Sequence, residues 1–307
     1  MRSQATGHFP QVRFSDARKW LYNPILKKRF ANRPEERVRL QYVEFLLHQT
    51  TVSPNRIGFE APVKTESAEN TLRADLVIYD RDMAPYVLIE CKSGRIKLNA
   101  KTAEQTARYN RTLQADFLMI TNGTDDFWYQ CDGQKISPLQ NHPFDLKPQE
   151  TEPVNPTDYW IKRGFVDTSL TEPITESAGK FLNSVFAPPE PADITYLNLP
   201  EDISTFSLDH FYRIYKSDTG DSLALSLIAD SSNQTVLSAV LNQDGQNRGV
   251  LWVPLAKIFS TASPEAIRLT PGGRSVIQFP EVARSLMTAP SRSNIKKLVN
   301  HLINLFD

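Results

Sequence analysis

The chain has 307 residues, of which 35 are basic, 35 are acidic and two are cysteines. A chain this long can bury one large or two smaller cores, and its zero net charge excludes a global attraction to nucleic acid or acidic membranes. Two cysteines, Cys91 and Cys131, exclude a disulfide scaffold and fit reduced thiols in a cytoplasm. No run approaches the ~20 apolar residues that span a bilayer, and no signal peptide is visible, so we expect a soluble cytoplasmic protein without a membrane partner.

Residues 1–31 are predicted to form a basic N-terminal extension. Between residues 11 and 40 the chain carries nine lysines and arginines against three acids. The basic residues are Arg13, Arg18, Lys19, Lys27, Lys28, Arg29, Arg33, Arg37 and Arg39. Because the whole chain is neutral, any polyanion would have to be bound by such a local patch. A solvated helix face would explain the same pattern.

Residues 32–48 are predicted to form a helix. Asn32 suits the N-cap, Pro34 suits the first turn, and Glu35 has the spacing of a capping box. Apolar side chains then recur at helical intervals and predict one buried face. This face comprises Val38, Tyr42, Phe45 and Leu46.

Strands, a second helix and further strands are predicted after this first helix. The strand-like segments are 56–64, 72–80, 86–93, 115–123 and 127–131, and Asn122-Gly123 and Asp132-Gly133 are turn signals. Residues 100–114 contain no Gly or Pro and predict a helix between the third and fourth strands. This order favours an α/β (α+β) domain over residues 32–136, in which helices pack on a central mixed sheet.

The second half of the chain is predicted to be a separate, smaller β-rich domain over residues 158–307. Five prolines at 137–157 indicate a linker before it. The domain is expected to contain a helix near 175–186, a hairpin turn at Asp244-Gly245 and a terminal amphipathic helix over 293–306. Its role is not indicated by any motif.

Three charged residues stand in or beside apolar runs: Asp75 in "LRADLVIYD", and Glu90 and Lys92 in "YVLIECKS". Residues two apart on a strand face the same side, so Glu90 and Lys92 project together, and a neighbouring strand could add Asp75. Two carboxylates suit Mg²⁺, which lowers the pKa of a bound water and offsets charge on a phosphodiester transition state. The alternative is a modest ion pair at a sheet edge, worth about 0–1 kcal/mol when exposed.

The surroundings of this triplet resemble the PD-(D/E)xK nuclease superfamily, in particular the N-terminal nuclease domain of type I restriction enzyme R (HsdR-like) proteins. The resemblance covers about residues 32–135 and depends on elements in the same order. These elements are "PEERVR", "RADLVIYD", "LIECKS", "EQTARYN" and "LMITNG". It departs from the superfamily at Ala74, which stands where the name-giving proline would be and carries no ligand.

The resemblance implies roles for six residues. Asp75, Glu90 and Glu36 correspond to the metal-binding acids, and Lys92 corresponds to the catalytic lysine. Gln105 and Tyr109 match the QxxxY motif that lies beside the active site in RecB-like members. Their spacing of four residues places both on one helical face, which agrees with this role independently.

The implied activity is endonucleolytic hydrolysis of DNA with Mg²⁺, or Mn²⁺ in its place, in restriction, genome defence or DNA repair. No GxxxxGK[ST] loop occurs, so we expect a stand-alone form without the helicase motor. Other defence or repair subunits and a homo-oligomer are left open as partners. Two alternatives also remain open: a non-catalytic DNA-binding or assembly module with the nuclease fold, and a nuclease for RNA or branched substrates.

Overall fold

The chain divides into two compact units in a computed structural model. The first unit comprises Met1–Pro10 and Trp20–Thr151, and the second comprises Gln11–Lys19 and Glu152–Asp307. The structure describes residues 1–63, 72–94, 106–107, 110–133, 135–143, 155–187, 193–199, 206–217, 220–260 and 263–306, with the backbone alone at 61–63 and 72–73. Residues 144–154 of the predicted linker therefore lie outside the described part.

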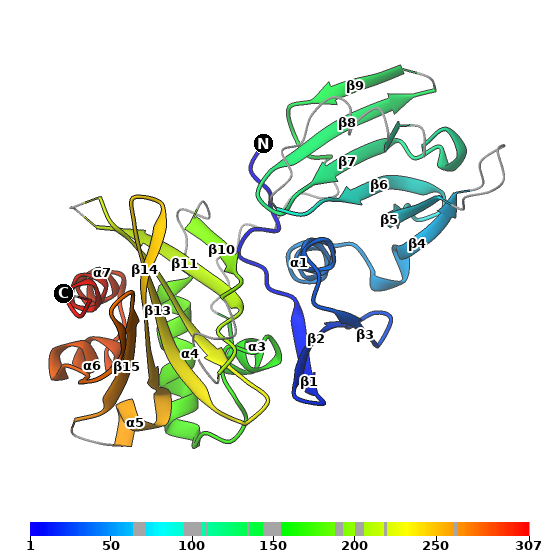
Figure 1. Cartoon of the computed structure of the whole chain (residues 1–307). Coiled ribbons are helices and arrows are strands. Elements are labelled where there is room, and N and C mark those ends of the chain that lie inside the picture. Colours follow the sequence, from blue (N-terminus) through cyan, green and yellow to red (C-terminus); the bar gives the residue numbers. More distant parts are fainter. Residues whose placement is uncertain are drawn as a thin grey trace. The chain divides into compact units, whose positions relative to one another are not determined.

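The first unit contains one long helix and a six-stranded sheet (Figure 1). Its elements are β2 (Arg18–Asn23), which begins in the second unit, β3 (Lys28–Ala31), α1 (Pro34–Gln49), β4 (Ile57–Val63), β5 (Leu72–Tyr79), β6 (Pro85–Cys91), β7 (Phe117–Thr121), β8 (Asp126–Asp132) and β9 (Lys135–Leu139), with a 3₁₀ turn at Pro54–Arg56. The sheet follows chain order from β4 to β9, and β1 (Gln11–Ser15) belongs to the second unit.

The six-stranded sheet is mixed, as the sequence predicted. Strands β6 and β7 are parallel, and the other neighbouring pairs are antiparallel. A parallel pair needs a crossover connection, and residues 106–107 and 110–113 of the predicted second helix are helical in this connection. Helix α1 packs against β6 (Figure 1) and places Tyr42, Phe45 and Leu46 in the core with almost no exposed surface.

The predicted Asn32 N-cap and capping box of α1 are wrong, whereas Pro34 lies in the first turn as predicted. Arg33 occupies the N-cap position, and no side chain caps the helix. The side-chain oxygen of Asn32 instead accepts a 2.9 Å hydrogen bond from Arg37 Nη1. The predicted apolar face is buried, but Arg37, Arg39, Gln41 and Glu44 are buried as well. The sequence pattern could not show this, because polar side chains are buried here by forming tertiary contacts.

Residues 11–31 form strands rather than a helix, so the solvated-helix interpretation of this basic segment is wrong. Strands β2 and β3 pair antiparallel, with Trp20 opposite Ala31 and Asn23 opposite Lys28. Strand β9 was also not predicted, because two prolines near its end suggested a linker. Pro138 is accommodated because β9 is the last strand of the sheet and has only one paired side.

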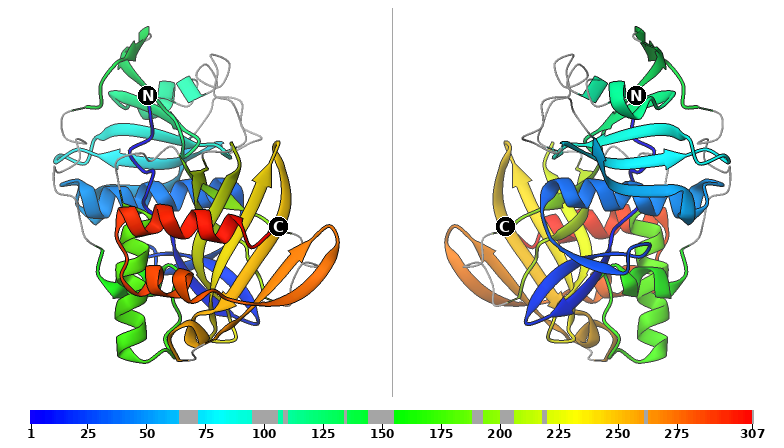
Figure 2. Two further views of the ribbon diagram at one scale, coloured as in Figure 1. Left: turned by 90° about the vertical axis from the view of Figure 1, so that its left-hand side faces the viewer. Right: turned by 90° about the vertical axis from the view of Figure 1, so that its right-hand side faces the viewer.

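The second unit is built on a seven-stranded antiparallel sheet in chain order. Its strands are β10 (Ile194–Leu197), β11 (His210–Lys216), β12 (Ser222–Ala229), β13 (Thr235–Gln243), β14 (Gln246–Pro254), β15 (Glu265–Thr270) and β16 (Gly273–Gln278). Its helices are α3 (Thr157–Lys162), α4 (Glu172–Val185), α5 (Leu255–Ser260), α6 (Glu281–Thr288) and α7 (Arg292–Ile303). The left view of Figure 2 shows α6 and α7 across one face of this sheet.

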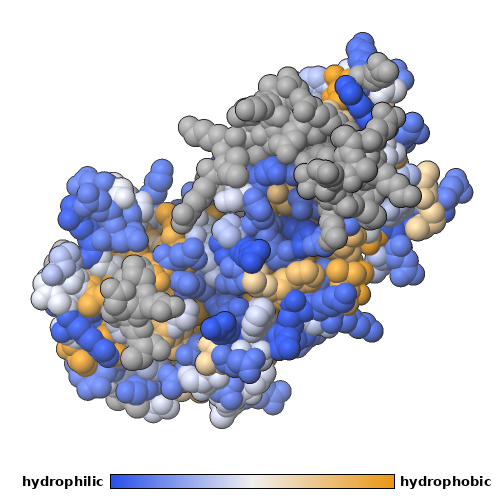
Figure 3. Space-filling model, turned by 45° about the vertical axis from the view of Figure 1, so that its right-hand side comes forward, coloured by the Kyte–Doolittle hydropathy of each residue, from blue (hydrophilic) through white to orange (hydrophobic). Residues whose placement is uncertain are grey.

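The fold class predicted for the chain is confirmed by the mixed sheet of the first unit and the β-rich second unit, but the second unit is not the smaller of the two. The hairpin predicted at Asp244-Gly245 joins β13 and β14, and both turn residues have positive φ, of 51° and 76°. No helix in the described part of the chain is long and apolar enough to cross a membrane. Hydrophilic residues predominate on the face drawn in Figure 3, with smaller hydrophobic areas between them.

Candidate active site

Asp75 and Glu90 lie at the same level of neighbouring antiparallel strands. The ladder between β5 and β6 pairs Val77 with Leu88 and Leu76 with Ile89, and its next step places Asp75 opposite Glu90. Here the backbone N–H of Cys91 donates a 2.7 Å hydrogen bond to Asp75 Oδ2, so this side-chain oxygen takes the place of a backbone acceptor. The two strands therefore bring two carboxylates together, although like charges directly opposite one another are destabilising.

Lys92 partly compensates this acidic pair. It follows the last residue of β6, and its backbone N–H still donates a 2.8 Å hydrogen bond to the Thr121 carbonyl. Its Nζ lies 2.5 Å from Glu90 Oε1. Lys92 was predicted to lie on the strand, whereas it lies just beyond the strand's end and still faces Glu90.

One carboxylate oxygen of Glu90 has no hydrogen-bond partner in the part of the chain that the structure describes. Glu90 is 7% exposed, and within the described residues its Oε2 is buried without a hydrogen bond. Burial and the nearby Asp75 carboxylate raise the pKa of Glu90 to about 7, although Lys92 opposes the shift. A buried carboxylate oxygen without a donor is costly, and a cation is the kind of group that would relieve that cost.

The pKa values of Asp75 and Lys92 are also raised. Burial raises the pKa of Asp75, and the Cys91 N–H and the charges of Arg39 and Lys92 oppose this shift. Burial alone would lower the pKa of Lys92, but its hydrogen bond to Glu90 and the surrounding acids raise it. These opposed effects show that Asp75, Glu90 and Lys92 act on one another electrostatically.

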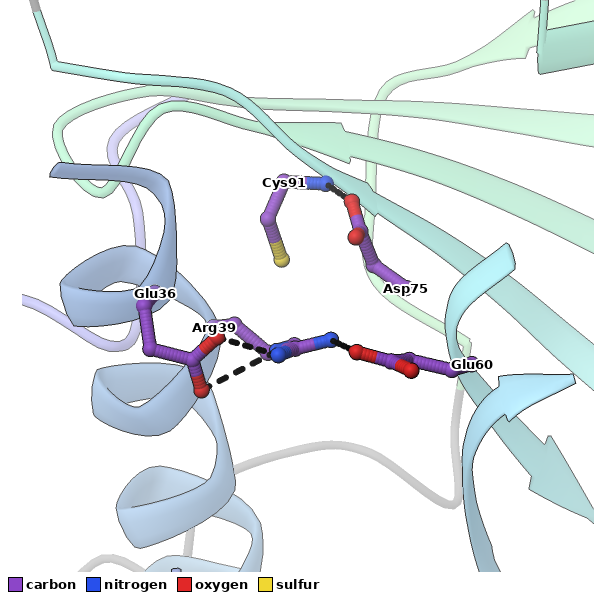
Figure 4. Close-up of polar contacts among 5 residues, drawn as sticks. All are labelled: Glu36, Arg39, Glu60, Asp75 and Cys91. Carbon is purple, nitrogen blue, oxygen red and sulfur yellow. Dashed lines mark hydrogen bonds and ion pairs between the residues drawn. The ribbon is translucent and has the colours of Figure 1, made fainter. Parts of the chain in front are cut away.

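Glu36 is brought near Asp75, but it is engaged by Arg39 (Figure 4). Its two carboxylate oxygens form ion-pair contacts with Arg39 Nη2 and Nε, three residues further along α1. Arg39 Nη1 also donates a 3.2 Å hydrogen bond to Glu60 Oε1 on β4. Arg39 therefore links the helix that carries Glu36 to the strand beside Asp75.

Arg39 and Glu60 were not predicted as parts of the site. Only the spacing of three residues between Glu36 and Arg39 on a predicted helix could have suggested the ion pair. Glu60 carries no motif, but its φ of 47° is unusual for a glutamate inside a strand. The register is the same on both sides of it, with Phe59 opposite Leu76 and Ala61 opposite Ala74.

Two predicted site residues, Gln105 and Tyr109, lie outside the described residues. Their proposed place beside the site stays a prediction. Helical Thr106 and Asn110, which adjoin them in sequence, are both buried.

The donor chemistry of the site fits a small divalent cation. Asp75 and Glu90 supply hard carboxylate oxygens, and Mg²⁺ is commonly held by one or two carboxylates with water and substrate phosphates completing its shell. Among the described residues, no group of three or more His, Cys, Asp and Glu side chains is arranged to hold a metal ion. The arrangement thus fits a two-carboxylate site and does not supply a complete protein cage.

Comparison with known families identifies the domain that carries these residues. Residues 34–143 match the family model described as type I restriction enzyme R protein N terminus (HSDR_N). This part of the chain is similar to the N-terminal domain of type I restriction enzyme R proteins, in agreement with the sequence elements, and the match covers a little over a third of the chain. No curated protein and no solved structure matches the chain.

Proposed function

We propose that the first unit is a DNA endonuclease of the PD-(D/E)xK type, dependent on Mg²⁺ or Mn²⁺, in which Asp75 and Glu90 hold the metal ion. The observation that carries the proposal is the buried Oε2 of Glu90, which has no hydrogen-bond partner among the described residues and lies beside the Asp75 carboxylate. The family match supports a nuclease, because its description is that of a restriction enzyme R protein. A divalent cation bound there would supply Lewis-acid stabilisation of developing negative charge and would favour deprotonation of an attacking water.

The chain's own residues have distinct tasks in this proposal. Asp75 is oriented by the Cys91 N–H, so its carboxylate is held in one direction. Lys92 positions Glu90 and presents a cation that can stabilise charge on the scissile phosphate. Glu36 would have to give up its contacts with Arg39 to bind the metal directly, so we propose that it acts on the metal site without being a direct ligand. Gln105 and Tyr109 are proposed to support the site from the next helix.

The biological setting proposed here is restriction or genome defence, with DNA repair as the other case. The matching family is described as part of a type I restriction enzyme, so other restriction, defence or repair subunits are proposed partners.

A cleavage assay tests the activity. Wild type should nick or cut plasmid DNA with Mg²⁺ or Mn²⁺, and Asp75→Ala and Lys92→Ala should each lower the rate by about 10²–10³-fold or more. Lys162→Ala removes an exposed lysine that pairs with Asp158 in the second unit and serves as the matched control. Duplex, single-stranded, branched and RNA substrates should be compared in parallel. Equal cleavage by wild type and Lys92→Ala would contradict the proposal.

A second candidate is a non-catalytic DNA-binding or assembly module that retains the fold. It is favoured by the engagement of Glu36 with Arg39, which leaves two carboxylates rather than three at the centre. Calorimetric titration separates the two candidates. Binding of Mn²⁺ to wild type that disappears in Asp75→Ala supports the nuclease, and no binding to wild type supports the module.

A further inference from the structure

The hairpin formed by β2 and β3 presents a cluster of exposed cations, and its Phe30 contacts Arg39, which pairs with Glu36 and Glu60. We propose that this basic hairpin, defined by Lys27, Lys28 and Arg29, binds the phosphate backbone of DNA and positions the duplex at Asp75 and Glu90. The inference rests on the proposed function for the identity of the substrate. The hairpin lies outside residues 34–143, so the family match does not assign it any role.

The charge of this segment is one-sided. Residues 17–34 contain six lysines and arginines and no acid, although the whole chain has equal numbers of basic and acidic residues. The run from Leu26 to Arg29 is exposed, and so is Arg33. Phosphate contacts in protein–DNA complexes come mainly from Lys and Arg side chains. A neutral protein that binds DNA needs such a local positive surface.

The hairpin is held in a defined shape. Asn23 is buried, and its Oδ1 accepts hydrogen bonds of 2.9 and 3.0 Å from the backbone N–H groups of Ile25 and Leu26. Lys27 has a φ of 54°, which closes the turn before β3. Its cations are therefore carried on an ordered turn and strand, which lowers the entropy lost when they bind phosphates.

The same hairpin is anchored to the site through Phe30. The Arg39 guanidinium carbon lies 5.5 Å from the centre of the Phe30 ring, within the range of a cation–π contact. Arg39 in turn contacts Glu36 and Glu60, so Phe30 of β3 contacts the arginine that forms these ion pairs. Lys28 is two residues from Phe30, which is about 7 Å along a strand.

A duplex that reaches both the hairpin and the acid pair can offer several phosphates to Lys27, Lys28 and Arg29 at once, because DNA carries one charge per about 1.7 Å of helix axis. The connection from β3 to α1 is also fixed, because Arg37 Nη1 donates to both the backbone and the side-chain oxygen of Asn32. The hairpin and the helix that carries Glu36 are therefore held in a fixed arrangement in which both can contact the substrate.

The test measures binding without cleavage. Anisotropy of a short fluorescent duplex in EDTA should be followed over a range of salt concentrations. Replacing Lys27, Lys28 and Arg29 together with Ala should weaken binding on the order of 100-fold at about 0.1 M salt and lower the slope of log K against log salt by about 2–3. Arg292, Lys296 and Lys297, exposed on α7, are replaced together as a control that removes the same charge.

Single substitutions keep the test decisive if the triple variant is unstable. Lys27→Ala and Lys28→Ala should each lower the salt slope by about one. An unchanged slope and affinity in the hairpin variants would overturn the inference, as would a wild type that does not bind duplex DNA. Loss of binding to anionic phospholipid vesicles, with duplex binding unchanged, would also overturn it in favour of a lipid surface.

Measurements of DNA binding and DNA cleavage can refute the hairpin inference and the proposed nuclease activity independently. If Lys92→Ala binds DNA like wild type but does not cut it, while the hairpin variants bind and cut like wild type, the nuclease stands and the hairpin inference fails. If wild type never cuts DNA but the hairpin variants lose binding, the hairpin inference stands and the proposed catalysis fails.

Discussion

Lys92 holds one carboxylate oxygen of Glu90 at 2.5 Å and leaves the other oxygen buried without a hydrogen bond among the described residues. Asp75 lies across the strand pair from Glu90 and repels the same carboxylate. A single lysine therefore faces two acids. This imbalance gives the metal-free protein measurable properties that do not require a cleavage assay.

Glu90 should make the metal-free protein less stable as the pH rises. The pKa of Glu90 is raised to about 7 in the folded protein from an ordinary value near 4.5, so between these values the folded state binds more protons than the unfolded state. The free energy of unfolding should fall through this window, by at most about 3 kcal/mol from this group. Urea unfolding in EDTA at several pH values measures it. Glu90→Gln should lack this fall in the free energy of unfolding. Equal dependence on pH in wild type and Glu90→Gln would contradict the assignment to Glu90.

The affinity for a metal ion should rise with pH, whereas the stability of the metal-free protein should fall. A cation competes with the proton for Glu90, and a pKa near 7 predicts that apparent affinity rises about tenfold between pH 6 and pH 8. Mn²⁺ or Mg²⁺ should therefore raise the melting temperature more at pH 8 than at pH 6. Glu90→Gln should abolish the metal-dependent shift, and EDTA should reverse it in wild type. A shift of equal size in wild type and Glu90→Gln would place the metal elsewhere.

Arg39 should stabilise the first unit through charge and shape together. It is 7% exposed and contacts Glu36, Glu60 and the Phe30 ring. Arg39→Met leaves Glu36 half-buried without its partner, so we expect a loss of about 2–4 kcal/mol in chemical unfolding. Arg39→Lys should recover part of this loss because it keeps the charge but not the branched geometry. Glu60→Gln, at a more exposed acid, should cost about 1 kcal/mol or less.

Much of the first unit could be predicted because its strands alternate with clear turn signals. Strand periodicity predicted that Glu90 and Lys92 project together, and that Asp75 could join them if its strand paired beside theirs. The register and the 2.5 Å contact agree with that geometry. The end of β6 before Lys92 could not be predicted, because the apolar run gives no signal there. Strand ends are set by tertiary partners, in this case the Asp75 carboxylate that takes the Cys91 N–H.

The partners of Glu36 could not be predicted with the same means. A helical glutamate facing a metal and one facing an arginine have the same sequence pattern. The contact of Arg39 with Glu60 also depends on a strand whose backbone is irregular at Glu60. The N-terminal strands were not predicted, because each is short and holds few apolar residues among its basic ones. Examples are Trp20 and Tyr22 on β2 and Phe30 on β3. Charge patterning indicated that the segment was unusual, but it did not indicate its structure.

The first ten residues should be required for the stability of the first unit, although the family match begins at residue 34. Ala5 and Phe9 are 1% exposed, and Gln41 of α1 donates to the Ala5 carbonyl. Asp126 is fully buried, and its Oδ2 accepts a 3.2 Å hydrogen bond from the Gln4 N–H. Removing residues 2–9 would leave Asp126 short of donors and expose a core surface.

We therefore expect this deletion to cost at least about 3 kcal/mol, seen as a lower melting temperature and faster limited proteolysis of the first unit. Phe9→Ala should account for much of the loss, because replacing a buried phenylalanine with alanine typically costs about 3–5 kcal/mol. Exposed Arg2→Ala is the matched control and should change stability by less than about 0.5 kcal/mol. A deletion variant that melts like wild type would show that residues 34–143 fold without this segment. It would also mean that the contacts of Asp126 with residues 1–10 contribute nothing measurable.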